Sequence, residues 1–253
     1  MDEIKAVLFD LGDTLVNFGK LSTTRMVLQG ARSSYDYLKG QGQPVRSFAG
    51  YFFRYLVRLR IRYFLSEYRG KDFDSLALLE ETGRQEGLTC SRAEWERVIW
   101  HWYEPLSKLA QLECDLAETL TDLQAMGLKL GIVSNTFVNR ASLERHLEQL
   151  GIRDFFPLRL YSYEVGLRKP DRRIFRIAAE RVDEAPSDIL FVGDRIDKDI
   201  VPALDIGMKA ALKDAYTNAG KQTPAGAWRI SRIAELPGLI ERAKSGMAQT
   251  APA

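Results

Sequence analysis

The sequence predicts an α/β protein whose Rossmann-like, doubly wound parallel sheet carries a helical cap domain inserted after its first strand. The short, nearly continuous apolar runs AVLFDL, KLGIVSN and DILFVGD are typical of strands buried on both faces. Amphipathic helical patterns alternate with such runs from about residue 115 to about residue 213. The long interval between the first run and this alternation is rich in helix formers and contains no strand–helix alternation.

Five apolar segments are expected to form the sheet. They are Ala6–Leu11, Leu128–Asn135, Leu158–Tyr163, Asp188–Gly193 and Lys209–Leu212. The helices between the later strands carry leucines at helical spacing, as at Leu116, Leu120 and Leu123. Gly127 and Gly151 follow two of these helices, at the C′ position that favours glycine. Strand and helix signals therefore agree on a parallel sheet.

The interval 17–109 is predicted to be a helical cap domain. The segments RSSYDYLKG, SLALLEETGRQEG and SRAEWERVIWHWYEPLSKLAQL have helical patterns, and Ser91 with Glu94 fits a capping box. The segment YFFRYLVRLRIRYFLSEYRG alternates over residues 57–63 as a strand would, yet its arginines also recur at helical spacing. Because the run is long for one strand, we predict a helix with a solvated arginine face.

The core domain is predicted to comprise residues 1–16 and 110–241. Residues 242–253 are expected to form a disordered tail, because this segment is small, polar and unpatterned. The 36 Lys and Arg residues nearly balance the 34 Asp and Glu residues, so the charge favours neither nucleic acid nor a membrane as a partner.

Composition also points to a compartment. Cys90 and Cys114 are too few for a disulfide framework and fit a reducing environment. The chain start lacks the basic region of a signal peptide, and no apolar stretch approaches the roughly 18 residues of a membrane span. A cytoplasmic protein is expected, and its oligomeric state stays open.

Polar and charged residues stand at or after the ends of four predicted strands, where ligands bind in an open parallel sheet. They are Asp10, Ser134 with Asn135, Lys169, and the pair Asp194 and Asp199. Clustered carboxylates repel one another unless a cation sits among them, and Mg²⁺ prefers a few carboxylate oxygens with a substrate phosphate. A hydroxyl, backbone amides and a lysine suit phosphoryl oxygens. The pattern predicts a site for Mg²⁺ and a phosphorylated small molecule.

Four segments in this order, FDLGDTLV, VSNT, KPD and VGDRIDKD, resemble the four motifs of the haloacid dehalogenase (HAD) superfamily. The resemblance extends over nearly the whole chain. The helical insertion resembles the family's C1-type cap, and GDRIDKDIVPALDIGM is especially similar to the phosphatase branch. The resemblance implies an Mg²⁺-dependent hydrolase, most directly a phosphatase acting on a small phosphorylated metabolite.

The resemblance also implies a nucleophile and a metal site. Asp10 would attack phosphorus and form an aspartyl-phosphate, which water then hydrolyses. Asp10, the backbone carbonyl of Gly12 and Asp194 would ligate Mg²⁺. Asp199 would hold the waters of the metal or the neighbouring lysine.

Phosphate binding is implied at the second and third motifs. Ser134 and the backbone amide of Asn135 would bind the phosphoryl oxygens. Lys169 would neutralise the nucleophile and the transferring group. The expected catalytic residues are Asp10, Ser134 and Lys169.

Gly12 departs from the family's pattern. Most phosphatases of the family carry a second Asp at this position, which protonates the leaving oxygen and later activates water. General acid–base groups contribute about 10²–10⁴-fold, so Gly12 predicts a slow phosphatase, one restricted to good leaving groups, or different chemistry. Asp13 could serve as the acid if the turn shifts, or a group of the cap or the substrate could replace it.

Other functions stay open beside the phosphatase. The 2-haloacid dehalogenases use the same nucleophile on carbon without a metal, but generally lack the acidic pair retained here as Asp194 and Asp199. Phosphonate hydrolases use a cap lysine, and nothing distinguishes Lys20, Lys39 or Lys71 for that role. A HAD scaffold retained as a binding or regulatory module is the non-enzymatic alternative. The substrate itself cannot be read from the sequence, because specificity lies in the cap.

Overall fold

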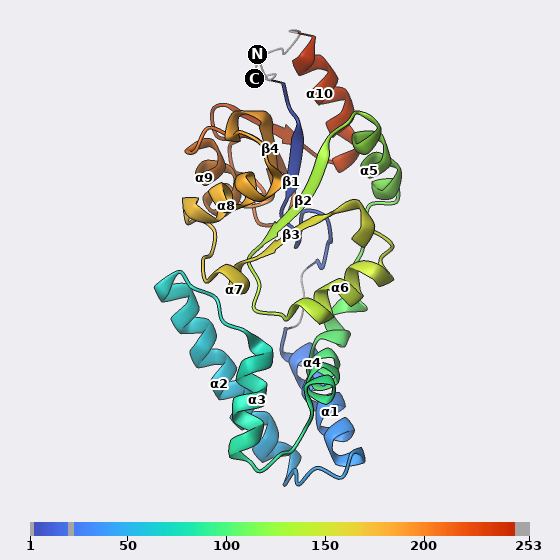
Figure 1. Ribbon diagram of the computed structural model, residues 1–253, viewed down its shortest axis with the longest axis vertical. Helices are drawn as coiled ribbons and strands as arrows, with labels where there is room; N and C mark the ends of the chain where they lie inside the picture. The colour runs from blue at the N-terminus through green and yellow to red at the C-terminus, as the bar shows by residue number, and fades with distance from the viewer. Residues whose placement is uncertain (1–2, 20–22, 246–253) are drawn as a thin grey trace.

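The computed structural model describes residues 3–19 and 23–245, and its centre is a parallel sheet of six strands (Figure 1). The strand order is β3-β2-β1-β4-β5-β6. The strands are β1 (Ala6–Phe9), β2 (Lys129–Ser134), β3 (Leu158–Tyr161), β4 (Ile189–Gly193), β5 (Lys209–Lys213) and β6 (Ala227–Ile230). All neighbouring strands pair in parallel, so the predicted fold class is confirmed.

The strands differ from the prediction in three main respects. The predicted strand Leu158–Tyr163 ends at Tyr161, because a short helix, α7 (Ser162–Val165), begins at the next residue. β1 ends at Phe9 rather than Leu11, because the chain turns at Asp10 to reach the next bridge, between Gly12 and Val16. The edge strand β6 was not predicted, since only Ile230 of its four residues AWRI is buried and no apolar alternation marks it.

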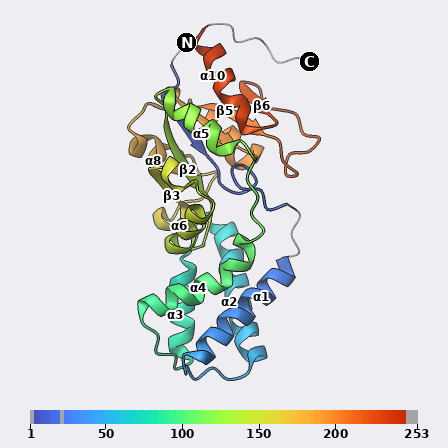
Figure 2. The same cartoon turned by 90° about the vertical axis from the view of Figure 1, so that its right-hand side faces the viewer.

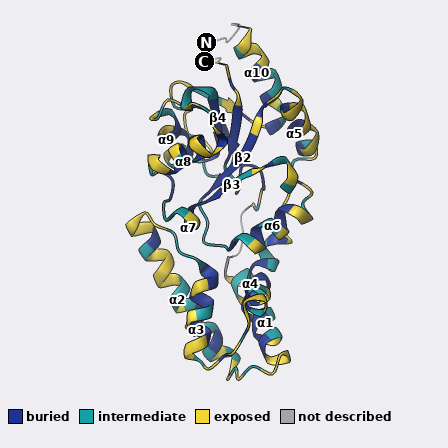
Figure 3. Ribbon diagram, viewed as in Figure 1, coloured by how far each residue is buried: buried dark blue, intermediate teal, exposed yellow. Residues whose placement is uncertain are grey.

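Helices cover both faces of the sheet, and the pleat of β1 shows how. Val7 and Phe9 belong to a core cluster shared with the helices α5 (Leu116–Ala125), α6 (Arg140–Gln149) and α10 (Leu236–Lys244). Ala6 and Leu8 belong to the opposite cluster, shared with α8 (Arg172–Val182) and α9 (Val201–Leu204). The strands are accordingly buried on both sides (Figure 3), as their continuous apolar runs predicted.

Four helices lie between β1 and α5 and form a separate body below the sheet (Figures 1 and 2). They are α1 (Thr23–Gly40), α2 (Phe48–Arg69), α3 (Ser75–Gln85) and α4 (Arg92–Ser107), and they are called the cap from here on. The cap has its own apolar core around Leu38, Leu76 and Trp95. Gly30 lets α1 approach α4 closely, because a Cβ there would lie 2.5 Å from the carbonyl oxygen of Trp102.

The ambiguous segment is helical, and α2 spans nearly all of it. Two of its arginines contact α3 and the residue that ends it: Arg54 pairs with Glu86, and Arg58 donates to Thr82 at 3.1 Å. The predicted capping box is confirmed, because Ser91 and Glu94 exchange side-chain and backbone hydrogen bonds at the start of α4.

The chain enters and leaves the cap at one place. The backbone of Asn17 donates to Gln111 at 2.8 Å, and that of Gln111 donates back to Asn17 at 2.9 Å. This pair lies close to both predicted domain boundaries. At the other end of the chain, α10 continues to Lys244, three residues into the expected tail; residues 246–253 lie outside the described part. Among the described residues, no helix combines the length and apolarity needed to cross a bilayer.

Candidate active site

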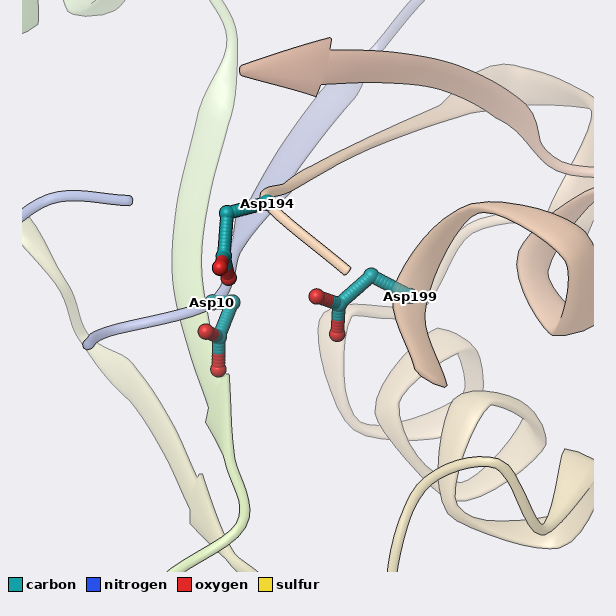
Figure 4. A group of neighbouring side chains, drawn as sticks. All are labelled: Asp10, Asp194 and Asp199. Atoms are coloured by element: carbon teal, nitrogen blue, oxygen red, sulfur yellow. The ribbon is translucent and has the colours of Figure 1, made fainter. Parts of the chain in front are cut away.

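Three carboxylates meet at the carboxyl ends of the central strands. Asp10 follows β1, Asp194 follows its neighbour β4, and Asp199 lies in a π-helical turn, Ile196–Ile200. One oxygen of each lies within 4.8 Å of the others, and the carboxylates turn toward a common space (Figure 4). The strand pairing of Phe9 with Val192 explains the meeting, since both strands end at the same level.

Lys169 joins two of these carboxylates. Its Nζ lies 2.6 Å from Asp10 Oδ1 and 2.6 Å from Asp199 Oδ1, and its side chain is only 2% exposed. The side chain of Asn135 fixes the backbone of the lysine: it donates to Lys169 O at 2.8 Å and accepts from Lys169 N at 2.8 Å. The sequence predicted a backbone role for Asn135 and gave no signal for this clamp.

The electrostatics of the cluster are dominated by burial. Burial raises the pKa of Asp10, with Asp194 adding to the rise and Lys169 opposing it. Burial also raises the pKa of Asp194 and of Asp199 to about 6 each. For Lys169 burial works in the opposite direction, but Asp10 and Asp199 outweigh it and raise the pKa. Three carboxyls thus face one ammonium, and a divalent cation would complete the charge balance.

The loop after β5 holds Asp194 in place. Thr217 donates its hydroxyl to Asp194 Oδ2, and the buried Asn218 side chain donates to the carbonyl of Asp194 at 2.8 Å and to that of Lys213 at 2.7 Å. Sequence reasoning missed Thr217 and Asn218, because they match no motif. Their only signal is their place after a strand end, the same rule that identified the other site residues.

A cavity of about 400 Å³ brings the predicted site residues together. Every one of them lines it: Asp10, Gly12, Asp13, Ser134, Asn135, Lys169, Asp194 and Asp199. Ser134 ends β2 and is buried, with its neighbour Asn135 at the start of the loop that follows. Lys39 and Lys71 do not line this cavity, and Lys20 lies outside the described residues, whereas the core residues Arg168 and Lys198 do line it.

The turn after Asp10 holds Asp13 by hydrogen bonds of its backbone and its side chain. Asp13 adopts a left-handed conformation with φ 57°, and its N–H donates to Val16 at 2.7 Å. Its carboxylate accepts a hydrogen bond from the N–H of Phe18 at 3.4 Å. Burial is the main cause that raises the pKa of Tyr216, and the negative charge of Asp13 adds to the rise. A Cβ at Gly12 would meet only the Phe18 ring, at 3.9 Å, so the fold leaves room there for a side chain.

A buried ion pair ties the cap to the core beside Lys169. Arg168 donates to Asp72 of the cap at 2.9 Å and to Ser66 at 2.7 Å, and it also pairs with Glu67. The side chains of Arg168 and Asp72 are 9% and 1% exposed. Ser162 of the core donates to the same Asp72 carboxylate. The cap is therefore docked through charged groups that are largely desolvated.

Arg168→Met is expected to lower the free energy of unfolding by about 3–5 kcal/mol, because it leaves the Asp72 carboxylate buried without a cation. Urea unfolding measures the loss. Arg172→Met is the matched control: its pair with Asp205, at 2.6 Å, is largely exposed, and its removal should cost only about 0.2–1 kcal/mol. Equal losses for the two variants would contradict a special role for the buried pair.

The chain is similar to known phosphatases over different lengths. It is 33% identical over 129 residues to a glyceraldehyde 3-phosphate phosphatase of Methanocaldococcus jannaschii, a match that covers 50% of this chain and 55% of that protein. The chain thus spans about half the length of that relative. It is 26% identical to the glyceraldehyde 3-phosphate phosphatase of Pyrococcus furiosus, over 95% of this chain and 93% of that protein.

Solved structures agree on the fold. The crystal structure of a 2-haloacid dehalogenase from Pseudomonas syringae superposes with a TM-score of 0.62 at 24% identity, covering 95% of this chain and 99% of that chain. The family model of haloacid dehalogenase-like hydrolases matches residues 4–207, from the start of β1 past the π-helical turn that carries Asp199. The chain belongs to the haloacid dehalogenase-like hydrolase family, and it is an enzyme of the HAD hydrolase type.

Proposed function

We propose that this chain is an Mg²⁺-dependent phosphatase that hydrolyses a small phosphorylated metabolite through an aspartyl-phosphate on Asp10. The observation that carries the proposal is the acidic cluster of Asp10, Asp194 and Asp199, with oxygens within 4.8 Å of one another and Lys169 bonded to two of them. A 2-haloacid dehalogenase that attacks carbon has no need of this excess of carboxylates. Two relatives named as glyceraldehyde 3-phosphate phosphatases match 83% and 95% of this chain, and they support the same choice.

The donor set fits Mg²⁺, which prefers carboxylate and carbonyl oxygens. Asp10, Asp194 and the carbonyl of Gly12 would hold the ion. The 2.6 Å contact between Asp199 and Lys169 favours lysine positioning as the main task of Asp199. When bound, Mg²⁺ would supply the positive charge that lets the Asp10 carboxylate and an anionic phosphate approach each other.

The side chains then divide the reaction into two displacements. Asp10 forms a bond to phosphorus while the bond to the leaving oxygen breaks and its electron pair departs with that oxygen. Water next attacks the phosphorus of the aspartyl-phosphate, and the bond between phosphorus and the Asp10 oxygen breaks. This step frees phosphate, restores the Asp10 carboxylate and releases the proton of the water to phosphate or solvent. The Ser134 hydroxyl and the Asn135 N–H donate to phosphoryl oxygens, and Lys169 offsets the charge of the nucleophile.

The position of Gly12 sets the range of substrates. Gly12 has no proton to donate, and Asp13 is engaged in its own turn. A leaving group that departs as a stable anion therefore reacts faster than an alkoxide, which must be protonated. A cavity of about 400 Å³ suits a small molecule, and the two free cysteines suit the reducing cytoplasm, where we place this activity.

Phosphate release from acetyl phosphate and a panel of metabolite phosphates is expected to require Mg²⁺ and to weaken in acid. Burial raises the pKa of Asp194 to about 6, so below that pH a proton competes with the metal for its carboxylate. On the acid side of that pKa, the apparent Mg²⁺ affinity should fall by up to about tenfold per pH unit for each carboxyl that becomes protonated. Calorimetric Mg²⁺ titration between about pH 5 and about pH 8, beside a phosphate-release assay, measures both effects.

Two variants in one loop sharpen this test. Asp194→Asn should lose Mg²⁺ binding, while Asp197→Asn, whose carboxylate is exposed and paired with Arg195 at 3.0 Å, should keep both binding and its pH dependence. Release that survives a chelator would contradict the metal requirement. A folded protein with no turnover on the whole panel would favour the binding-module alternative.

A further inference from the structure

A partly open apolar chamber of about 230 Å³ lies among the cap helices, beside the catalytic cavity. All four cap helices contribute to its wall, with Val27 from α1, Tyr55 and Leu59 from α2, Leu79 from α3 and Ile99 from α4. The loop after β2 closes it from the core side. Apolar cavities of about 150 Å³ bind benzene, so this chamber has room for an aromatic ring with a small substituent.

The chamber and the catalytic cavity share part of their lining. Tyr103, Leu106, Phe137 and Val138 border both spaces. Phe137 is held from the cap side, since its ring stacks on Phe73 with centroids 5.2 Å apart. The two spaces therefore lie on either side of one shared wall.

Two residues of the chamber wall carry hydroxyl groups. Tyr55 and Ser75 are only 5% and 4% exposed, and both line the chamber. Within residues 3–19 and 23–245, neither the Tyr55 hydroxyl nor the Ser75 hydroxyl has a hydrogen-bond partner. Both hydroxyl oxygens are fully buried, so the surface that the chamber offers to a bound molecule is apolar.

We propose that the chamber receives the leaving group of the substrate, and that the substrate is an aryl phosphate with an apolar ring. The inference rests on the proposed phosphatase function and adds the substrate class. Two independent features agree on it: the apolar, ring-sized chamber, and the absence of a proton donor at Gly12.

The chemistry of the leaving group explains the agreement. A phenol has a pKa of about 10, like tyrosine, whereas an alcohol lies near water, at about 15.7. When Asp10 attacks, the bond between phosphorus and the aryl oxygen breaks, and the electron pair leaves on the phenolate. The phenolate takes its proton from water, so the enzyme needs no acid at position 12.

The test is a substrate series at nearly constant leaving-group chemistry. kcat/KM is measured for phenyl phosphate, 4-methylphenyl phosphate and 4-ethylphenyl phosphate, with acetyl phosphate as the small substrate that cannot fill the chamber. Each added carbon should raise kcat/KM by about fourfold, the factor expected for one buried methylene. This arm uses the unmodified protein and does not depend on any variant folding.

Matched variants locate the effect. Val27→Phe places a ring in the chamber, and Val57→Phe places the same ring on the exposed side of α2. Val27→Phe should abolish the gain along the aryl series while leaving acetyl phosphate unchanged, and Val57→Phe should change neither.

Different outcomes test the chamber assignment and the phosphatase function separately. A flat aryl series, or a Val27→Phe variant that keeps the gain, overturns the chamber assignment while Asp10-dependent hydrolysis of acetyl phosphate leaves the phosphatase standing. A folded protein that hydrolyses neither acetyl phosphate nor the aryl esters overturns the phosphatase, and the substrate class with it.

Discussion

Gly12→Asp is expected to raise kcat for alkyl phosphates by about 10²–10⁴-fold, the usual contribution of a general acid. The structure admits the substitution, because a Cβ at this position meets only the Phe18 ring at 3.9 Å and the backbone of Gly12 is not left-handed. The new carboxyl would lie two residues beyond Asp10 and line the same cavity. Steady-state phosphate release from an alkyl ester such as glycerol phosphate measures the gain.

Two comparisons isolate the proton from the shape of the side chain. Gly12→Asn has nearly the same volume as Gly12→Asp but carries no acid, and it should not raise the rate. Acetyl phosphate should gain little in either variant, because its leaving group departs as a stable anion. If the Asp and Asn variants behaved alike, proton donation at this position would not limit the enzyme.

Asp10→Asn is expected to reduce turnover by at least about 10⁴-fold while the protein still folds, because it removes the nucleophile itself. Asn is close to Asp in volume, and Lys169 keeps its 2.6 Å contact with Asp199. Thermal unfolding should therefore stay cooperative. Phosphate release from acetyl phosphate, the substrate least dependent on an acid, gives the most sensitive measure of the loss.

Asp13→Asn is the matched control, since it makes the same chemical change three residues away in the same cavity. The Asp13 carboxylate already accepts a hydrogen bond from the N–H of Phe18, so we expect turnover to change by less than about tenfold, below the range typical of a general acid. A large loss would instead identify Asp13 as the replacement acid. Activity that survives in Asp10→Asn would remove the covalent mechanism.

The fold was largely predictable, because its signals are local. Continuous apolar runs identify β1, β2 and β4, which are buried on both faces, and leucine spacing identifies helices such as α5. β6 escaped prediction because an edge strand with one buried residue carries almost no hydrophobic signal. The arginine-rich α2 was ambiguous because residues 57–63 fit two periods, and only its packing against α3 decides.

The candidate site could be predicted as far as strand ends determine it. Asp10 and Asp194 must meet, because β1 and β4 are neighbours in a parallel sheet. The side-chain clamp of Asn135 on Lys169 and the pairing of Arg168 with Asp72 join segments far apart in the sequence. The first contact depends on how two core loops pack and the second on how the cap docks on the core, and no local pattern encodes either. The chamber was unpredictable for the same reason, since four helices and one loop share it.

The most direct measurement of the central claim is mass spectrometry of the enzyme quenched in acid during turnover of acetyl phosphate. The account predicts that the peptide containing Asp10 gains the mass of one phosphoryl group, that hydroxylamine removes it, and that Asp10→Asn never acquires it. Sustained turnover with no such adduct, or an adduct that persists in Asp10→Asn, would contradict covalent catalysis by Asp10.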